Sequence, residues 1–122
     1  MKHLSNWIEI PVKNMDRARA FYQKVLEEPL QPVMDLGAAL YSLFPAQDRY
    51  NCGALAKGEG YVASNQGVTV YLDGGDDVER YLTRVKKAGG TVVLPKTYLG
   101  KEAGYIGLLL GSEGNRIGLQ SP

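Results

Sequence analysis

The stretch Ile8-Glu9-Ile10-Pro11-Val12 recurs at an offset of 60 residues as Val68-Thr69-Val70-Tyr71-Leu72. In both copies apolar side chains occupy every second position, which is the period of a strand with one buried face. A turn follows in each copy, and then apolar residues at helical spacing, which begin at Ala18 and at Val78. Because the two copies keep one register through a strand and a helix, the chain contains an internal repeat.

Each predicted helix has recognisable ends. Asn14 or Asp16, and Asp76 in the second copy, are candidate N-caps. Pro29 ends the first helix, and Gly89-Gly90 ends the second. Three more strands are predicted after each helix. They cover Leu30–Asp35, Ala38–Phe44 and Asn51–Lys57 in copy one, and Thr91–Leu94, Gly104–Leu110 and Asn115–Gln120 in copy two.

These elements predict an α+β protein of two tandem βαβββ modules, which form an open, curved eight-stranded mixed sheet around a cavity. The whole chain, 1–122, is one domain, with module one at 1–58, a linker at 58–66 and module two at 67–122. Copy two carries an insertion, predicted as a polar loop over Pro95–Ala103. Side chains that alternate with the helix-facing ones should line the cavity: Trp7, Glu9, Pro11, Cys52, Ala54, Ala56, Gly67, Thr69, Tyr71, Arg116, Gly118 and Gln120. A slip of one residue would reverse any of these assignments.

The composition limits the classes of function. Hydrophobic residues make up 44% and charged residues 22%, as in globular proteins. The net charge of +1 gives no electrostatic reason for binding nucleic acid or an anionic membrane. No apolar run approaches the ~20 residues that cross a bilayer, and no signal sequence is recognisable. The single cysteine, Cys52, excludes an internal disulfide framework, and we predict a cytoplasmic protein.

The residues from Ile10 to Tyr22, IPVKNMDRARAFY, resemble the opening strand, turn and helix of the vicinal oxygen chelate superfamily. That superfamily includes glyoxalase I, the bleomycin-resistance proteins and the extradiol dioxygenases. The residues from Ser112 to Leu119, SEGNRIGL, resemble its closing turn and strand. The resemblance covers nearly the whole chain, and it implies the fold more specifically than the function.

Enzymes of this superfamily hold a divalent metal through four strand positions that carry His, Gln or Glu. The resemblance places these positions at Trp7 or Glu9, Ala54 or Ala56, Gly67 or Val68, and Gly118 with Gln120 beside it. Most of these residues have no ligating side chain, and the one histidine, His3, lies at the start of the first strand. We therefore predict no metal and no other cofactor.

The predicted catalytic residues are Glu9 and Tyr105. Glu9 is either a carboxylate inside the cavity, acting as a general base or binding a cationic group, or an edge residue paired with Arg116 or with water. Tyr105 and Tyr41 lie on matching third strands, and each is either an acid catalyst or a packing residue.

The predicted substrate-binding residues are Trp7, Cys52, Thr69, Tyr71, Tyr98, Arg116 and Gln120. Trp7 and Tyr71 either stack on a ligand or belong to the core. Arg116 either clamps a substrate carboxylate or neutralises Glu9. Cys52 is a nucleophile or, more often for such a residue, an inert thiol. The segment 95–105 is either a lid or a solvated hairpin loop.

Three functions follow from the resemblance. The first is a metal-independent lyase or isomerase that uses Glu9 with a tyrosine. The second is a non-catalytic protein that sequesters a drug or metabolite, although a net charge of +1 does not suit a cationic glycopeptide. The third, a metal-dependent lactoylglutathione-lyase-like enzyme, is disfavoured by the missing ligands. The predicted partners are a small organic ligand and a second copy of the chain, and the cavity lies either within one chain or between two.

Overall fold

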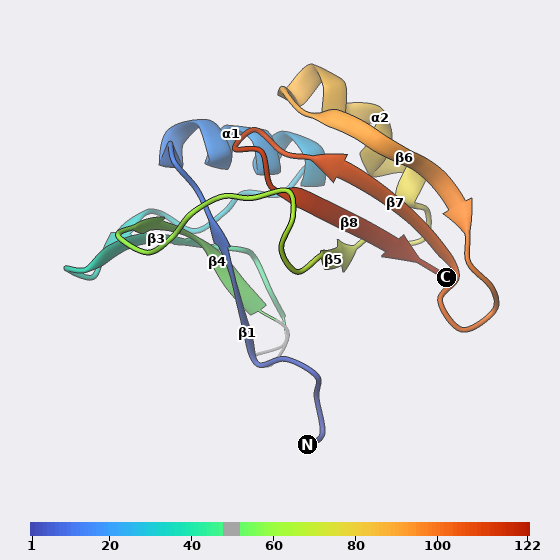
Figure 1. The fold of residues 1–122 in the computed structure, drawn as a ribbon, viewed down its shortest axis with the longest axis horizontal. Coiled ribbons are helices and arrows are strands. Elements are labelled where there is room, and N and C mark those ends of the chain that lie inside the picture. Colours follow the sequence, from blue (N-terminus) through green and yellow to red (C-terminus); the bar gives the residue numbers. More distant parts are fainter. Residues whose placement is uncertain (48–51) are drawn as a thin grey trace.

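A computed structural model describes residues 1–47 and 52–122 of the chain. The elements run in the order β1 (Trp7–Pro11), α1 (Met15–Leu26), β2 (Met34–Asp35), β3 (Ala39–Leu43), β4 (Cys52–Gly58), β5 (Val70–Asp73), α2 (Val78–Ala88), β6 (Thr91–Tyr98), β7 (Tyr105–Leu110) and β8 (Arg116–Ser121) (Figure 1). They form two four-stranded sheets, ordered β1-β4-β3-β2 and β5-β8-β7-β6. In each sheet the first strand of the module runs parallel to its last strand. The α+β class and the two tandem βαβββ modules are confirmed, as two mixed sheets that do not close.

Both helices begin at a side chain that caps them. The Asn14 side chain accepts a hydrogen bond from Arg17 N at 3.0 Å and caps α1, so the first of its two predicted caps is confirmed. In α2 the cap is Asp77, which accepts from Glu79 N at 3.0 Å, and the prediction of Asp76 was wrong by one residue. Among the described residues, no helix is long and apolar enough to cross a membrane.

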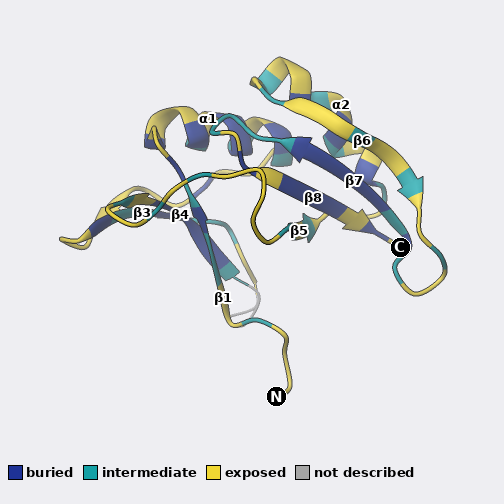
Figure 2. Cartoon of the chain, in the orientation of Figure 1, coloured by how far each residue is buried: buried dark blue, intermediate teal, exposed yellow. Residues whose placement is uncertain are grey.

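One hydrophobic core joins the two modules. The apolar faces of α1 and α2 pack against each other and against both sheets. The buried residues of these elements are dark blue in Figure 2. Ile10 and Leu55 reach this core from the first sheet, and Ile117 and Leu119 reach it from the second. Each sheet therefore has one helix-facing side, which meets the core, and one side turned away from the helices. We call the second side the outer face.

Two predicted strands differ from the structure. The strand predicted at Leu30–Asp35 is only the two-residue β2, because Pro32 interrupts this segment and has no N–H for a ladder. The loop predicted at Pro95–Ala103 is instead strand as far as Tyr98, and only the residues from Leu99 onward leave the sheet. The register of β6 on β7 shifts twice, so irregularities in this edge strand absorb the extra residues of copy two. The first residue predicted for the fourth strand, Asn51, lies outside the described residues.

A turn of module two holds the start of the first helix. The Glu113 carboxylate accepts hydrogen bonds from Lys13 N and Asn14 N, at 2.9 and 2.8 Å, and pairs with Arg17. Two residues later, Asn115 donates to Pro11 O at 2.7 Å. These contacts fix the end of β1 against the β7–β8 turn, and they help to set the position of module one relative to module two.

Candidate functional site

The outer face of the first sheet carries Trp7 and Glu9. The parallel pairing of β1 with β4 places Trp7 beside Cys52 and Glu9 beside Ala54. On the next strand Tyr41 lies opposite Ala56, so it shares this face. The small side chains of β4 leave room on this face for the larger side chains of Trp7, Glu9 and Tyr41, which form part of a polar cluster.

The Glu9 carboxylate is held at both oxygens. Trp7 Nε1 donates to Glu9 Oε2 at 3.1 Å, and the Tyr61 hydroxyl donates to Glu9 Oε1 at 2.8 Å. The Tyr61 hydroxyl also lies 2.9 Å from the Tyr41 hydroxyl. We call Trp7, Glu9, Tyr41 and Tyr61 the Glu9 quartet. It fixes one carboxylate and several aromatic rings on a face that solvent can reach.

The contacts of Tyr61 also set its protonation. The hydrogen bond with Tyr41 and then the one with Glu9 raise the pKa of the Tyr61 phenol above its ordinary range. A phenol of this kind keeps its proton at neutral pH and remains a donor. The quartet therefore presents a protonated phenol and a hydrogen-bonded carboxylate side by side to a ligand.

Arg116 does not neutralise Glu9. Within residues 1–47 and 52–122, no ion pair joins these two side chains. Arg116 stands exposed on the outer face of the second sheet, opposite Leu110. The pairing that the sequence left open is not found, so the guanidinium group stays available to an anionic ligand group.

The outer face of the second sheet brings together three of the predicted binding residues. Tyr71 pairs with Gly118, and a Cβ on Gly118 would lie 2.4 Å from the ring of Tyr71, so this ring rests on the glycine. Gln120 lies on the same face, where its Nε2 donates to Ala103 O at 2.6 Å. Thr69 precedes β5 and is half-buried. Tyr71, Arg116 and Gln120 thus form one surface on module two.

Tyr105 lies on the other side of its sheet. It pairs with Ser121, one step along from the pair of Ile106 and Gln120, so its ring points to the helix-facing side and packs against the core. The Tyr98 ring lies 5.1 Å from it, centroid to centroid. The structure therefore does not bring Tyr105 and Glu9 together, and the tyrosine next to Glu9 is Tyr61.

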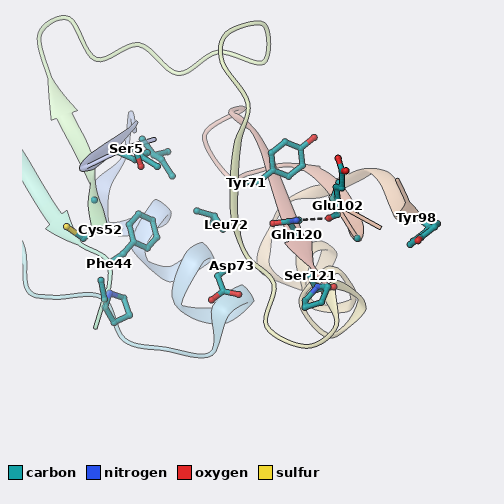
Figure 3. A pocket seen from close by; sticks show the side chains of 18 of the residues that line it. Ser5, Phe44, Cys52, Tyr71, Leu72, Asp73, Tyr98, Glu102, Gln120 and Ser121 are labelled. Carbon is teal, nitrogen blue, oxygen red and sulfur yellow. Dashed lines mark hydrogen bonds between the residues drawn. The ribbon is translucent and has the colours of Figure 1, made fainter. Parts of the chain in front are cut away.

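A cavity of about 880 Å³ lies between the two sheets (Figure 3). Four predicted binding residues line it: Cys52, Tyr71, Tyr98 and Gln120. The residues from Lys101 to Gly104, part of the segment predicted as a lid or a hairpin loop, form one of its walls. Trp7 and Glu9 are not among its lining residues, so the cavity and the Glu9 quartet are separate features.

The residues present do not fit a metal site of the kind that the family resemblance implies. In the part of the chain that the structure describes, no three His, Cys, Asp or Glu side chains lie close enough to share a metal ion. Both oxygens of Glu9 already accept hydrogen bonds from Trp7 and Tyr61. Gln120 belongs to module two and donates to a backbone carbonyl.

Sequence reasoning missed Tyr61 and Glu113. Tyr61 belongs to the segment between the modules, which has no periodic pattern to assign its side chain to a face. Glu113 stands in a turn, and its contacts with Lys13 and Asn14 join residues about a hundred positions apart. The sequence shows an acidic residue in the closing turn, but no pattern in the neighbouring residues indicated that Glu113 would contact Lys13 and Asn14.

Comparisons with known proteins agree with this geometry. The family model described as Glyoxalase/Bleomycin resistance protein/Dioxygenase superfamily matches residues 4–119. No curated protein matches the sequence. Among solved structures, UcmS2 is similar with a TM-score of 0.70 and 20% identity, over 100% of both chains.

Two further solved structures are similar in fold. TnmS3, an antibiotic binding protein from Streptomyces sp. CB03234, is similar with a TM-score of 0.68 and 19% identity, over 100% of this chain and 97% of its own. Glyoxalase I from Zea mays is similar with a TM-score of 0.70 and 16% identity, over 97% of this chain and 44% of its own. At these identities the likeness shows the fold, and the family match shows the ancestry. The chain belongs to the Glyoxalase/Bleomycin resistance protein/Dioxygenase superfamily.

Proposed function

We propose that this protein binds a small organic molecule on the outer faces of its sheets, without a metal ion, and that it acts by binding rather than by catalysis. The observation that carries the proposal is the Glu9 quartet, which holds a carboxylate and three aromatic rings together around one strand position that the family resemblance assigns to a metal ligand. Aromatic rings with a few fixed polar groups are typical of small-molecule sites. The fold likeness to an antibiotic binding protein supports the same function.

The test is binding of a panel of acidic, aromatic and glycopeptide compounds, measured by calorimetry. For any compound that binds, Trp7→Ala should weaken affinity by at least about tenfold, because buried aromatic anchors dominate such sites. Glu59→Gln, a change to an exposed glutamate in the linker between the modules, should leave affinity unchanged. If Trp7→Ala and Glu59→Gln bind every compound as tightly as the wild type, the outer face is not the site.

We further propose that the binding site is completed by a second copy of the chain. Trp7 and Tyr71 stand 43% and 44% exposed on the outer faces of a single chain, which is unusual for rings in a binding site. A second copy that covers these faces would bury them and supply the opposite wall. Light scattering should therefore give twice the chain mass of 13.3 kDa. A mass of one chain at about 100 μM, a concentration far above the Kd of a stable dimer, would contradict this arrangement.

The second candidate function is a metal-independent lyase or isomerase. The contact that favours it is the Tyr61 hydroxyl, 2.8 Å from Glu9 and 2.9 Å from Tyr41, because it positions the Glu9 carboxylate, which could accept a proton from a bound substrate. Turnover that Glu9→Gln abolishes while ligand affinity is kept would favour this enzyme over the binding protein. Elemental analysis that finds one divalent metal per chain would refute the metal-free part of both proposals.

The lone cysteine, Cys52, supports a cytoplasmic location for either kind of protein.

A further inference from the structure

We infer that the cavity between the two sheets is a second binding site, distinct from the Glu9 quartet, and that it takes a ligand with a flat apolar body and a protonated amine. The inference goes beyond the proposed function, because the cavity has an apolar wall and a charged rim that the Glu9 quartet lacks, although Tyr71 and Gln120 belong both to the cavity and to the outer face of the second sheet. It rests on the position of the cavity, on its apolar wall and on the charges at its rim.

The cavity lies on the helix-facing side of β1. Ile8 and Ile10 line it, and both contact the hydrophobic core. Trp7 and Glu9 alternate with them along the strand and point to the outer face. Trp7 and Glu9 do not line the cavity, so a ligand that touches Ile8 and Ile10 lies apart from the quartet, although Cys52, which pairs with Trp7, also lines the cavity.

The wall is apolar and the volume suits a small molecule. Phe44, which directly follows β3, and Leu72 of β5 join Ile8 and Ile10 in lining the cavity (Figure 3). About 880 Å³ lies within the ~300–1,000 Å³ range of ligand sites. Water finds few partners on such a wall, so an apolar ligand surface would replace it favourably.

The rim is acidic. Asp73 and Glu102 bring two carboxylates to the cavity, and Lys101 brings one ammonium group. Asp73 Oδ1 accepts from Gly75 N at 2.8 Å, which orients this carboxylate and leaves Oδ2 for another donor. Within the described residues, neither Asp73 nor Glu102 takes part in an ion pair. The lining therefore carries a net negative charge that a bound cation can balance.

Two aromatic rings favour the same class of ligand. Tyr71 and Tyr98 both line the cavity, and both rings are partly exposed, at 44% and 58%. A tyrosine face attracts a cation and stacks on a planar group. Carboxylates, tyrosine rings and an apolar floor together suit an aromatic amine better than a neutral or acidic compound.

The experiment uses three probes with one ring system and different charge: 2-naphthylmethylamine, 2-naphthalenemethanol and 2-naphthoate. Each is titrated into the full chain, and binding is followed by amide chemical shifts. We expect saturable shifts at Ile8, Leu72 and Gly104, with the amine binding about fivefold tighter than the alcohol, the size of one exposed ion pair. Naphthoate should bind weakest of the three.

The matched variants test the charges. Asp73→Asn keeps the acceptor for Gly75 N and removes the charge, and together with Glu102→Gln it should abolish the preference for the amine. Asp35→Asn is the control, because Asp35 accepts from Gly37 N at 2.9 Å in a similar turn away from the cavity. The inference is overturned by any of three results: no saturable shifts, shifts centred on Trp7 and Glu9, or an amine preference that Asp35→Asn removes as strongly as the double variant.

Discussion

Replacing Gly53 with alanine is expected to lower the free energy of unfolding by more than about 3 kcal/mol, since it opens a strand pair and disturbs the packing around it. A Cβ at this position would lie 2.0 Å from the carbonyl oxygen of Ile8, which is backbone and cannot rotate away. Gly53 faces Ile8 in the parallel ladder of β1 with β4, so the two strands would have to separate. The change should also displace Trp7 and Glu9, and ligand affinity at the outer face should fall with stability.

The measurement is unfolding by urea, with Gly67→Ala as the matched control. No atom lies within 4 Å of a Cβ built on Gly67, and the residue is exposed. Its replacement should change the free energy of unfolding by no more than about 0.5 kcal/mol. If Gly53→Ala were as stable as Gly67→Ala, β1 would lie farther from β4 than the structure places it.

Replacing Glu113 with glutamine is the second large change, and it should cost about 2 kcal/mol at neutral pH. The Glu113 side chain is 1% exposed and accepts from Lys13 N, Asn14 N and Arg17. A glutamine offers one acceptor oxygen in place of two, and it brings an amino group toward backbone donors. Arg17 is half-exposed and can return to water, which keeps the loss below that of a fully buried ion pair.

The same carboxylate makes stability depend on pH. Burial opposes its charge, but hydrogen bonds from Arg17, Asn14 N, Ser112 and Lys13 N outweigh burial and lower the pKa of Glu113 to about 2. Because the folded value lies below the ordinary 4.5, the carboxylate contributes fully above that pH and its contribution is lost as the pH falls toward 2.

Urea unfolding at several pH values checks this dependence. The difference in unfolding free energy between wild type and Glu113→Gln should be largest above about pH 5 and should shrink as the pH falls to 2. Glu59→Gln, at an exposed position, should follow the wild type throughout. A difference between wild type and Glu113→Gln that stays constant across this range would contradict a charged, hydrogen-bonded Glu113.

The architecture could be predicted from the sequence because the two copies of the repeat give the same pattern independently. Alternation in two related strands and helical spacing after each of them predict the same module, and strand pairing agrees that Trp7 and Glu9 share a face with Cys52 and Ala54. Successive side chains of a strand point to opposite faces of the sheet, so alternating apolar residues in the sequence predict which side chains share a face.

The site was less predictable, and Tyr105 shows why. Tyr41 and Tyr105 occupy matching positions of the two copies, yet Tyr41 pairs with Ala56 and Tyr105 pairs with Ser121. The register of β7 on β8 therefore differs by one residue from the register of β3 on β4. This difference turns the Tyr41 ring to the outer face and the Tyr105 ring to the core. Tyr61 was missed for another reason: its contact with Glu9 joins a non-periodic segment to a strand 52 positions away.

The contacts of Glu113 and Asn115 have a consequence for how the protein folds. They join the first strand and helix to a turn between 99 and 104 positions later in the chain. During synthesis module one is made before these partners exist, so Lys13 N and Asn14 N at first lack the carboxylate that accepts from them in the folded protein. Such high contact order slows folding, because a large loop must close before the contact forms. Because module one by itself lacks these contacts and part of the shared core, we expect it to be only marginally stable when it is expressed alone.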